Sequence, residues 1–331
     1  MLDNSVREVT SKVIEIRRTD SNSEVEGPGV FAGRRFENCC EATMIARFRN
    51  KYNGKDALEN ATLCQYNFTN GRRNMRAKTL SMGVQMGGVG RTTATAVLCY
   101  ILSQIKKQKV LAVDFDSTGK LTHMLTQHDI YYFSGKTSFE AVKAMDPRSF
   151  ITKINEDLDL LPADDHLATL PHYLYTSSLN INPAMLLSKT LDKVKNDYDW
   201  IIIDLPPNSG DLVTNGLVAS DYSLAIFRTE QFSYLAIRPF LESIMDIQDT
   251  LNPDLQLLGI VPSVNSCKST SADEAVLETA KREYGNMLFN TVIYWYPRIK
   301  EWSESGITYS SKNQQDKESM SQYLALVAEM M

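Results

Sequence analysis

The stretch from residue 84 to residue 93 reads Val-Gln-Met-Gly-Gly-Val-Gly-Arg-Thr-Thr, and it constrains the fold more than any other part of the chain. A short apolar run at residues 80–84 precedes the glycines and predicts a strand. The apolar, alanine-bearing run at residues 94–105 predicts a helix after them. Strand, glycine loop and helix, in this order, are the context that a phosphate-binding loop requires. The chain is therefore expected to fold around an anion-binding turn.

Three glycines would give this loop its chemistry, because glycine adopts backbone angles that are closed to other residues. A loop of this kind can wrap an anion with its N–H groups. The three are Gly87, Gly88 and Gly90. A helix that begins near Arg91 adds the positive end of its dipole. A threonine at the start of that helix, Thr92, can hold Mg²⁺ with its hydroxyl.

Two later runs end in carboxylates. Residues 110–116 form a buried-strand pattern that ends in Asp114 and Asp116. Two carboxylates at the carboxyl end of a strand suit the positioning of a metal and a water beside phosphates. Residues 198–207 carry three isoleucines typical of a central strand, followed by Asp204, which can hold Mg²⁺ through water. Either run alone is also compatible with a plain strand end, but their order after the glycine loop favours a site.

Strand and helix patterns alternate from residue 78 to the end of the chain, which predicts a parallel sheet covered on both faces. The fold class is therefore α/β, a doubly wound and mostly parallel sheet with a short N-terminal extension. Helical patterns include residues 184–196 and 230–249. The expected strands are 79–85, 109–115, 158–162, 200–205, 222–228, 256–262 and 290–294.

Residues 78–331 resemble the ParA partition ATPases, within the wider MinD-like group of P-loop proteins. The glycine loop resembles the deviant Walker A box of that family, Asn-Gln-Lys-Gly-Gly-Val-Gly-Lys-Thr-Thr. Residues 198–207 are similar to its Walker B run almost residue for residue. Residues 114–118 resemble its Asp-x-Asp-Pro-Gln box, with Ser-Thr in place of Pro-Gln. The chain departs from the family at both Walker A lysines, where it has Met86 and Arg91.

The resemblance implies ATP and Mg²⁺ as cofactors, and it implies roles for individual residues. Asp116 would orient the attacking water, and Arg91 stands where the family has its phosphate-gripping lysine; these two are the expected catalytic residues. Mg²⁺ would be held by Thr92 and Asp204, with Asp114 supporting its shell. The expected nucleotide-binding residues are Gly87, Gly88, Val89, Gly90, Arg91, Thr92, Thr93 and, near the adenine, Asn265 and Arg298.

The resemblance also implies partners: a homodimer formed with ATP, DNA bound without sequence preference, and a ParB-like adaptor protein. The expected location is cytoplasmic and nucleoid-associated. No apolar run of about 18 residues occurs, so no membrane span is expected. Phosphate contacts leave no strict motif, and a solvated charged face is the ordinary alternative for each basic residue. The candidates are Arg238, Lys268, Lys281, Arg282, Lys300 and Lys312.

We expect the chain to divide into an N-terminal basic extension, residues 1–77, and a nucleotide-binding domain, residues 78–331. Residues 1–80 hold 14 Lys and Arg against 10 Asp and Glu, a balance of +4, which leaves −9 for the remainder of a chain whose net charge is −5. This asymmetry predicts that the extension binds DNA or associates with itself; an ordinary solvated surface is the alternative. The five cysteines show no metal-ligand spacing, so reduced thiols are expected.

The two missing lysines leave two functions open. Arginine keeps the positive charge at position 91 but is bulkier and planar, and Met86 carries no charge. Because a charged donor matters most where charge develops in the transition state, nucleotide binding is more secure than hydrolysis. The first function is a slow ATPase in DNA segregation. The second is a pseudo-ATPase scaffold that positions a protein or organelle cargo without hydrolysis.

Overall fold

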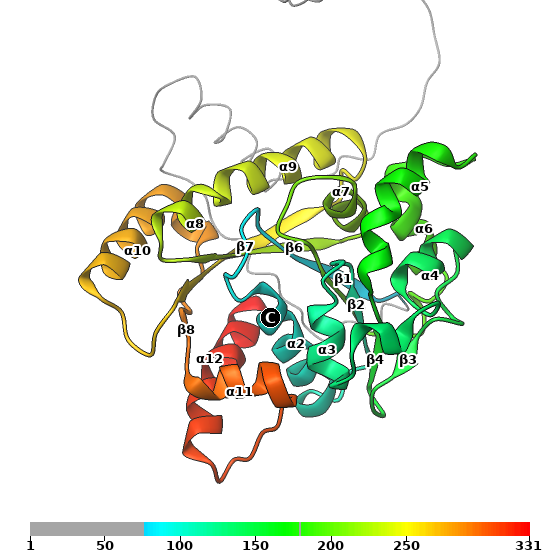
Figure 1. Ribbon diagram of the computed structural model, residues 1–331. Helices are drawn as coiled ribbons and strands as arrows, with labels where there is room; N and C mark the ends of the chain where they lie inside the picture. The colour runs from blue at the N-terminus through cyan, green and yellow to red at the C-terminus, as the bar shows by residue number, and fades with distance from the viewer. Residues whose placement is uncertain (1–75, 179) are drawn as a thin grey trace, which may run out of the picture.

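The computed structural model describes residues 76–178 and 180–331. All but the last two residues of the predicted extension, 1–77, lie outside the described residues, so its role stays a prediction. From Lys78 onward the chain forms one eight-stranded sheet with helices on both faces, as Figure 1 shows. The predicted α/β class with a mostly parallel sheet is confirmed.

The strands lie across the sheet in the order β3-β4-β2-β5-β1-β6-β7-β8. The short edge strand β3 runs antiparallel to β4, whereas the other neighbouring pairs are parallel. The strands are β1 Lys78–Gly83, β2 Val110–Asp114, β3 Thr152–Lys153, β4 Leu158–Leu161, β5 Trp200–Asp204, β6 Tyr222–Arg228, β7 Gln256–Val264 and β8 Ile293–Tyr294.

The strand order places β1 between β5 and β6, with β2 on the far side of β5. The chain therefore builds one side of the sheet, returns to the centre at β5, and then builds the other side. Such a reversal leaves a crevice at the carboxyl ends of the central strands, which is where open α/β sheets bind ligands. The register brings three strand ends level, because Asp204 pairs with Asp114 on one side and with Met82 on the other.

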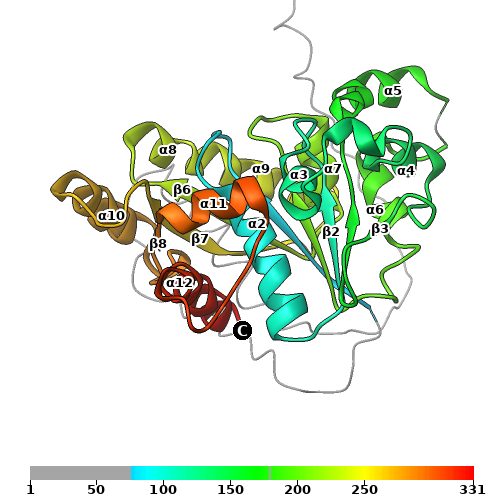
Figure 2. The ribbon, with the colours of Figure 1, turned by 60° about the horizontal axis from the view of Figure 1, so that its bottom comes forward.

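Two layers of helices cover the sheet, and each layer has its own apolar cluster. Residues of α2, α3, α11 and α12 form one cluster with the sheet, and residues of α4 to α7, α9 and α10 form the other. Figure 2 shows α2, α11 and α12 gathered on one face. The α-helices are α2 Arg91–Tyr100, α3 Lys120–Thr126, α4 Ser138–Ala144, α5 Leu170–Thr176, α6 Leu186–Leu191, α7 Asp211–Val218, α8 Gln231–Leu235, α9 Ile237–Thr250, α10 Ser271–Tyr284, α11 Pro297–Ser305 and α12 Gln314–Met330.

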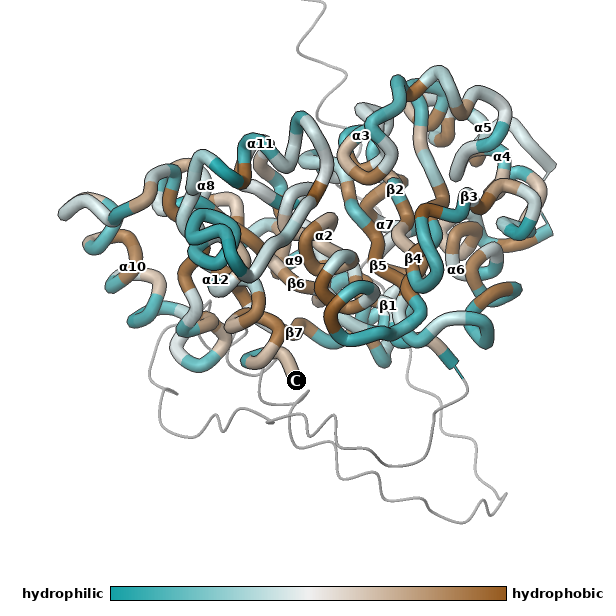
Figure 3. Tube along the Cα trace, turned by 90° about the horizontal axis from the view of Figure 1, so that it is seen from below, coloured by the Kyte–Doolittle hydropathy of each residue, from teal (hydrophilic) through white to brown (hydrophobic). Residues whose placement is uncertain are grey.

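The central strands are apolar on both sides, as a two-sided layer requires. In β5, Ile202 packs into the α2 layer while Ile201 and Ile203 pack into the α7 layer. In β1, Leu80 and Met82 face the α2 layer and are completely buried. Figure 3 shows the hydrophobic residues concentrated on the strands and on the inner sides of the helices. This packing holds the strand ends at fixed positions.

All seven predicted strands exist; β6 has the predicted bounds of 222–228, and the other six have shifted ends. The last is shorter than the predicted 290–294 because the backbone N–H groups of Asn290 and Thr291 bond to the side chain of Glu329 instead of to a strand. The predicted helix at 230–249 is two helices that meet at Ala236, and the helix at 184–196 ends at Leu191. Among the described residues, no helix has the length and apolarity to cross a membrane.

Candidate phosphate and metal site at the ends of β1, β2 and β5

The glycine loop runs from the end of β1 to the first turn of α2. Gly88 and Gly90 have φ angles of +76° and +90°, in the region that favours glycine. Gly87 and Gly88 are exposed at the crown of the loop, whereas Val89 is buried and its carbonyl accepts from Ser263 of β7 at 3.2 Å. The hydrogen bond to β7 therefore anchors the loop to the sheet, while its crown is exposed to solvent. The crown lies next to the N–H groups of the first turn of α2, which have no partner within the helix.

Thr92 joins this loop to the end of β5. Its hydroxyl donates to Oδ2 of Asp204 at 2.7 Å. Thr95 donates to the other oxygen of Asp204 at 3.1 Å. The predicted proximity of the loop to Asp204 is thus observed. Sequence reasoning missed Thr95; its spacing of three residues from Thr92 on a helix, which puts both on one face, was the available signal.

Asp114 lies at the end of β2 and is held entirely by protein donors. Its Oδ2 accepts from the N–H and the hydroxyl of Thr122 at 2.8 and 2.7 Å, and its Oδ1 accepts from the N–H of Asp116 at 3.2 Å. The Thr122 hydroxyl in turn accepts from the N–H of Ala163 at 2.9 Å, beyond β4. Burial is the main cause, and the nearby charge of Asp204 the second, that raises the pKa of Asp114 to about 7. Asp114 therefore fixes the loops beside the site.

Asp116 follows two residues later and faces the loop. Its Oδ1 accepts from the N–H and the hydroxyl of Thr118, both at 2.9 Å. Its Oδ2 lies 3.5 Å from the Nη2 of Arg91. Asp116 is 4% exposed, so a water bound to it would be largely screened from bulk solvent. The second carboxylate of the Asp-x-Asp pair thus lies beside the loop.

Arg91 points down into the strand ends and is only 6% exposed. Its Nη1 donates to the carbonyl of Val84 at 3.4 Å, its Nη2 meets Asp116, and its Nε lies 3.4 Å from Oδ1 of Asp204. Burial raises the pKa of Asp204, and the charge of Arg91 opposes that rise. The guanidinium therefore lies between the two carboxylates, beneath the loop.

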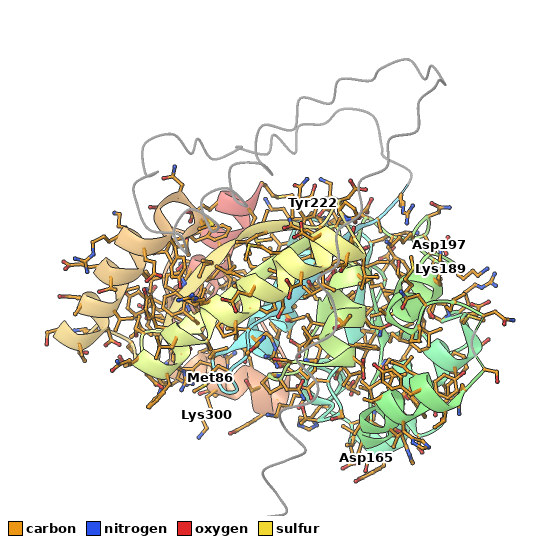
Figure 4. All side chains as sticks on the ribbon, turned by 90° about the horizontal axis from the view of Figure 1, so that it is seen from above. Met86, Asp165, Lys189, Asp197, Tyr222 and Lys300 are labelled. Carbon is orange, nitrogen blue, oxygen red and sulfur yellow. The ribbon has the colours of Figure 1, made fainter. Side chains whose placement is uncertain are left out.

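Met86 takes the position of the other family lysine. It is half-buried and packs against the apolar cluster of the α2 layer. Figure 4 labels it at the same end of the molecule as the exposed Lys300 of α11. An apolar side chain there places no charge at the loop.

The two predicted adenine contacts differ in their surroundings. Asn265 is exposed after β7 and lines a small hollow with Val89 and Gly90 of the loop. Arg298 is engaged by Asp316 at 2.5 Å and by Glu301 at 2.6 Å. Asn265 is thus free to meet a ligand, whereas Arg298 would have to leave its carboxylates. Both assignments stay predictions.

The basic residues suggested for DNA contact are spread over α9, α10, α11 and two loops, and only Lys281 and Arg282 share an element. Arg238 pairs with Glu242 within α9 at 3.3 Å, and Lys300 lies 3.9 Å from Glu304 within α11. All six are exposed: Arg238, Lys268, Lys281, Arg282, Lys300 and Lys312. This arrangement is that of a solvated mixed-charge face, and DNA binding by these residues stays a prediction.

Sequence comparison extends these observations. A family described as an AAA domain matches residues 77–257. The chromosome-partitioning ATPase Soj of Treponema pallidum is 30% identical over 244 residues, covering 72% of this chain and 91% of that protein. The sporulation initiation inhibitor protein Soj of Bacillus subtilis is 30% identical over 231 residues, covering 69% of this chain and 88% of that protein.

A solved structure shares the fold. The cobyrinic acid a,c-diamide synthase of Mycobacterium smegmatis, crystallised with an ATP analogue and magnesium, superposes with a TM-score of 0.64 at 27% identity. The alignment covers 76% of this chain and 94% of that one. A glycine loop between β1 and α2, facing an aspartate at the end of β5, defines a P-loop nucleotide-binding fold. Within that class, the chain belongs to the ParA-type family of P-loop ATPases.

Proposed function

We propose that this chain is an ATP-binding partition protein that acts in DNA segregation and hydrolyses ATP slowly. One observation carries the proposal: the hydrogen bond from Thr92 to Asp204 places the start of α2, the glycine loop and the end of β5 at one point. A hydroxyl, a carboxylate and a row of helix N–H groups are the parts that a triphosphate and its metal need.

The donor set fits Mg²⁺, because carboxylate and hydroxyl oxygens are its preferred ligands. Thr92 and Asp204 would hold it, with Asp114 supporting their surroundings through Thr122. When bound, the ion would neutralise charge on the phosphates during transfer. The M. smegmatis relative was crystallised with both an ATP analogue and magnesium, which supports the same pair of cofactors here.

The chain's own residues would divide the remaining work. The loop N–H groups, from Gly87 to Thr93, would bind the phosphates. Asp116, buried beside Thr118, would orient the attacking water. Arg91 would supply the positive charge that the family draws from lysine, and it would have to turn from its carboxylates to reach a phosphate. That rearrangement is one reason to propose slow turnover.

Assembly and partners belong to the same proposal. As the resemblance to the ParA family implies, ATP would hold the chain as a homodimer on nonspecific DNA, where a ParB-like adaptor would stimulate hydrolysis. The protein would then be cytoplasmic and nucleoid-associated. The pseudo-ATPase scaffold is the second candidate, and the two replaced lysines, Met86 and Arg91, favour it. In that case nucleotide would set the shape of the protein without being consumed.

Phosphate release by the full-length protein tests the choice. ATP is supplied with and without duplex DNA, and the ATP and the DNA that stay bound to the protein are measured in parallel. Thr92→Val, which removes the hydroxyl but keeps the side-chain shape, is the matched control. The proposal predicts slow release that depends on Thr92, with ATP-dependent DNA retention. ATP binding without release would favour the scaffold, and neither ATP binding nor DNA retention would overturn both.

A further inference from the structure

Three buried carboxylates gather at the strand ends, and one cation serves two of them. Asp114 and Asp204 are fully buried, and Asp116 is 4% exposed. Within residues 76–178 and 180–331, the ion pairs of Asp116 and of Asp204 both have Arg91 as the cation. The ammonium that the family places here is thus replaced by a larger group that contacts both acids at once.

The geometry of the guanidinium gives it a fixed orientation. Its three nitrogens face three different partners, Val84, Asp116 and Asp204. A guanidinium is planar and does not lose its proton in proteins, so its charge is permanent. Its Nε forms no hydrogen bond although it is buried. The group is therefore placed for charge neutralisation rather than for ideal hydrogen bonding.

A divalent ion at the same carboxylates would meet two costs. It would repel the guanidinium a few ångströms away, in a site with little water to screen the charges. It would also take away Asp204, one of the two acids that make burial of Arg91 tolerable, since a buried charge that loses a partner is expensive. Metal and guanidinium are therefore alternatives for Asp204.

We infer that Arg91 is an internal counter-cation that competes with divalent metal for Asp204. In the absence of phosphate the arginine holds the site, and metal binds weakly. The competition between Arg91 and metal does not depend on the proposed function. Its role in regulating nucleotide binding does rest on that function. Its test uses metal alone, so failure of ATP binding would not decide it.

The experiment is a Mn²⁺ titration of the full-length protein without nucleotide, followed by the electron paramagnetic resonance signal of the free ion. Arg91→Met keeps the aliphatic stem and removes the charge. We expect it to bind Mn²⁺ at least about tenfold more tightly than the native protein, a difference of about 1.4 kcal/mol. Adding Asp204→Asn to this variant should abolish the gain. Arg148→Met removes an exposed arginine that pairs with Asp146 and should change nothing.

Equal Mn²⁺ affinities for the native protein and Arg91→Met would overturn the inference, as would no measurable binding to either. Circular dichroism checks that the variant is folded. If it is not, the native protein still decides: an Asp204-dependent Mn²⁺ dissociation constant below about 100 µM, tight for a site without phosphate, would show that Arg91 does not compete. A purely structural ion pair would leave the affinities equal.

Discussion

Thr92 donates to Asp204 across 2.7 Å, although 112 residues separate them along the chain. The bond ties the first turn of α2 to the end of β5, and Thr95 adds a second tie one turn further on. The position of the glycine loop thus depends on the position of the Asp204 carboxylate. A substitution at Asp204 should therefore lower the free energy of unfolding as well as weaken ligand binding.

Asp204→Ala should lower the free energy of unfolding by about 3 kcal/mol or more, because it leaves Arg91 buried with one of its two acids missing. It also leaves the Thr92 hydroxyl without its acceptor, whereas the Thr95 hydroxyl keeps the carbonyl of Arg91. Urea unfolding measures the change. The control, Glu230→Ala, removes a half-exposed partner of Arg228 and should cost less than about 1 kcal/mol. An equal decrease in the free energy of unfolding for both variants would mean that the buried Arg91–Asp204 pair stabilises the protein no more than an exposed pair does.

Asp114 predicts a pH dependence of stability. Its pKa of about 7 in the folded protein lies above the value of about 3.9 expected in the unfolded chain. The folded state therefore binds this proton more tightly, and the Asp114 contribution to stability falls as pH rises from about 4 to 7. Relative to Asp114→Asn, the native protein should lose up to about 1.4 kcal/mol per pH unit in that window. Parallel stability curves for the two proteins would contradict this.

The N-terminal extension is expected to contribute to DNA binding or self-association. Deleting residues 1–75 leaves Ala77, which is buried and bonds to the carbonyl of Lys195 at 2.6 Å, so the sheet should stay intact. Affinity for nonspecific duplex at two salt concentrations should fall, and its salt slope should flatten as phosphate contacts are lost. Sedimentation reports the oligomeric state. Unchanged affinity, slope and oligomeric state would remove the idea.

Restoring both family lysines, Met86→Lys with Arg91→Lys, should raise turnover by a larger factor than it raises ATP affinity. The loop N–H groups bind phosphate without either side chain, whereas the lysines' charge counts most in the transition state. A gain on the order of a hundredfold to a thousandfold is the scale expected from charged donors of this kind. Phosphate release and equilibrium binding are measured together, with Met86→Leu as the uncharged control. Much tighter binding with unchanged turnover would locate the defect in loop geometry or dimerisation.

Sequence order predicted the sheet and the neighbours of the loop, because glycines and strand-end acids report local geometry directly. The resemblance to the ParA family implied that Thr92 and Asp204 share one metal site, and open α/β sheets bind ligands at the carboxyl ends of their strands. The direction of Arg91 did not follow, because it depends on partners from three separate segments, Val84, Asp116 and Asp204. The edge strand β3 was missed because two residues, Thr152 and Lys153, are too few to form a pattern. The surroundings of Arg298 also depend on a distant residue, Asp316.

Equilibrium binding of ATP to the native full-length protein tests the central claim most directly. Calorimetric titration with Mg²⁺ present should give a dissociation constant in the micromolar range, about −8 kcal/mol. Gly90→Val should weaken binding at least about tenfold, because a β-branched residue does not adopt the φ of +90° that the loop requires. Saturable ATP binding by the native protein that this variant loses is the predicted result. No ATP binding at millimolar concentration, or equal binding by both proteins, would contradict the account.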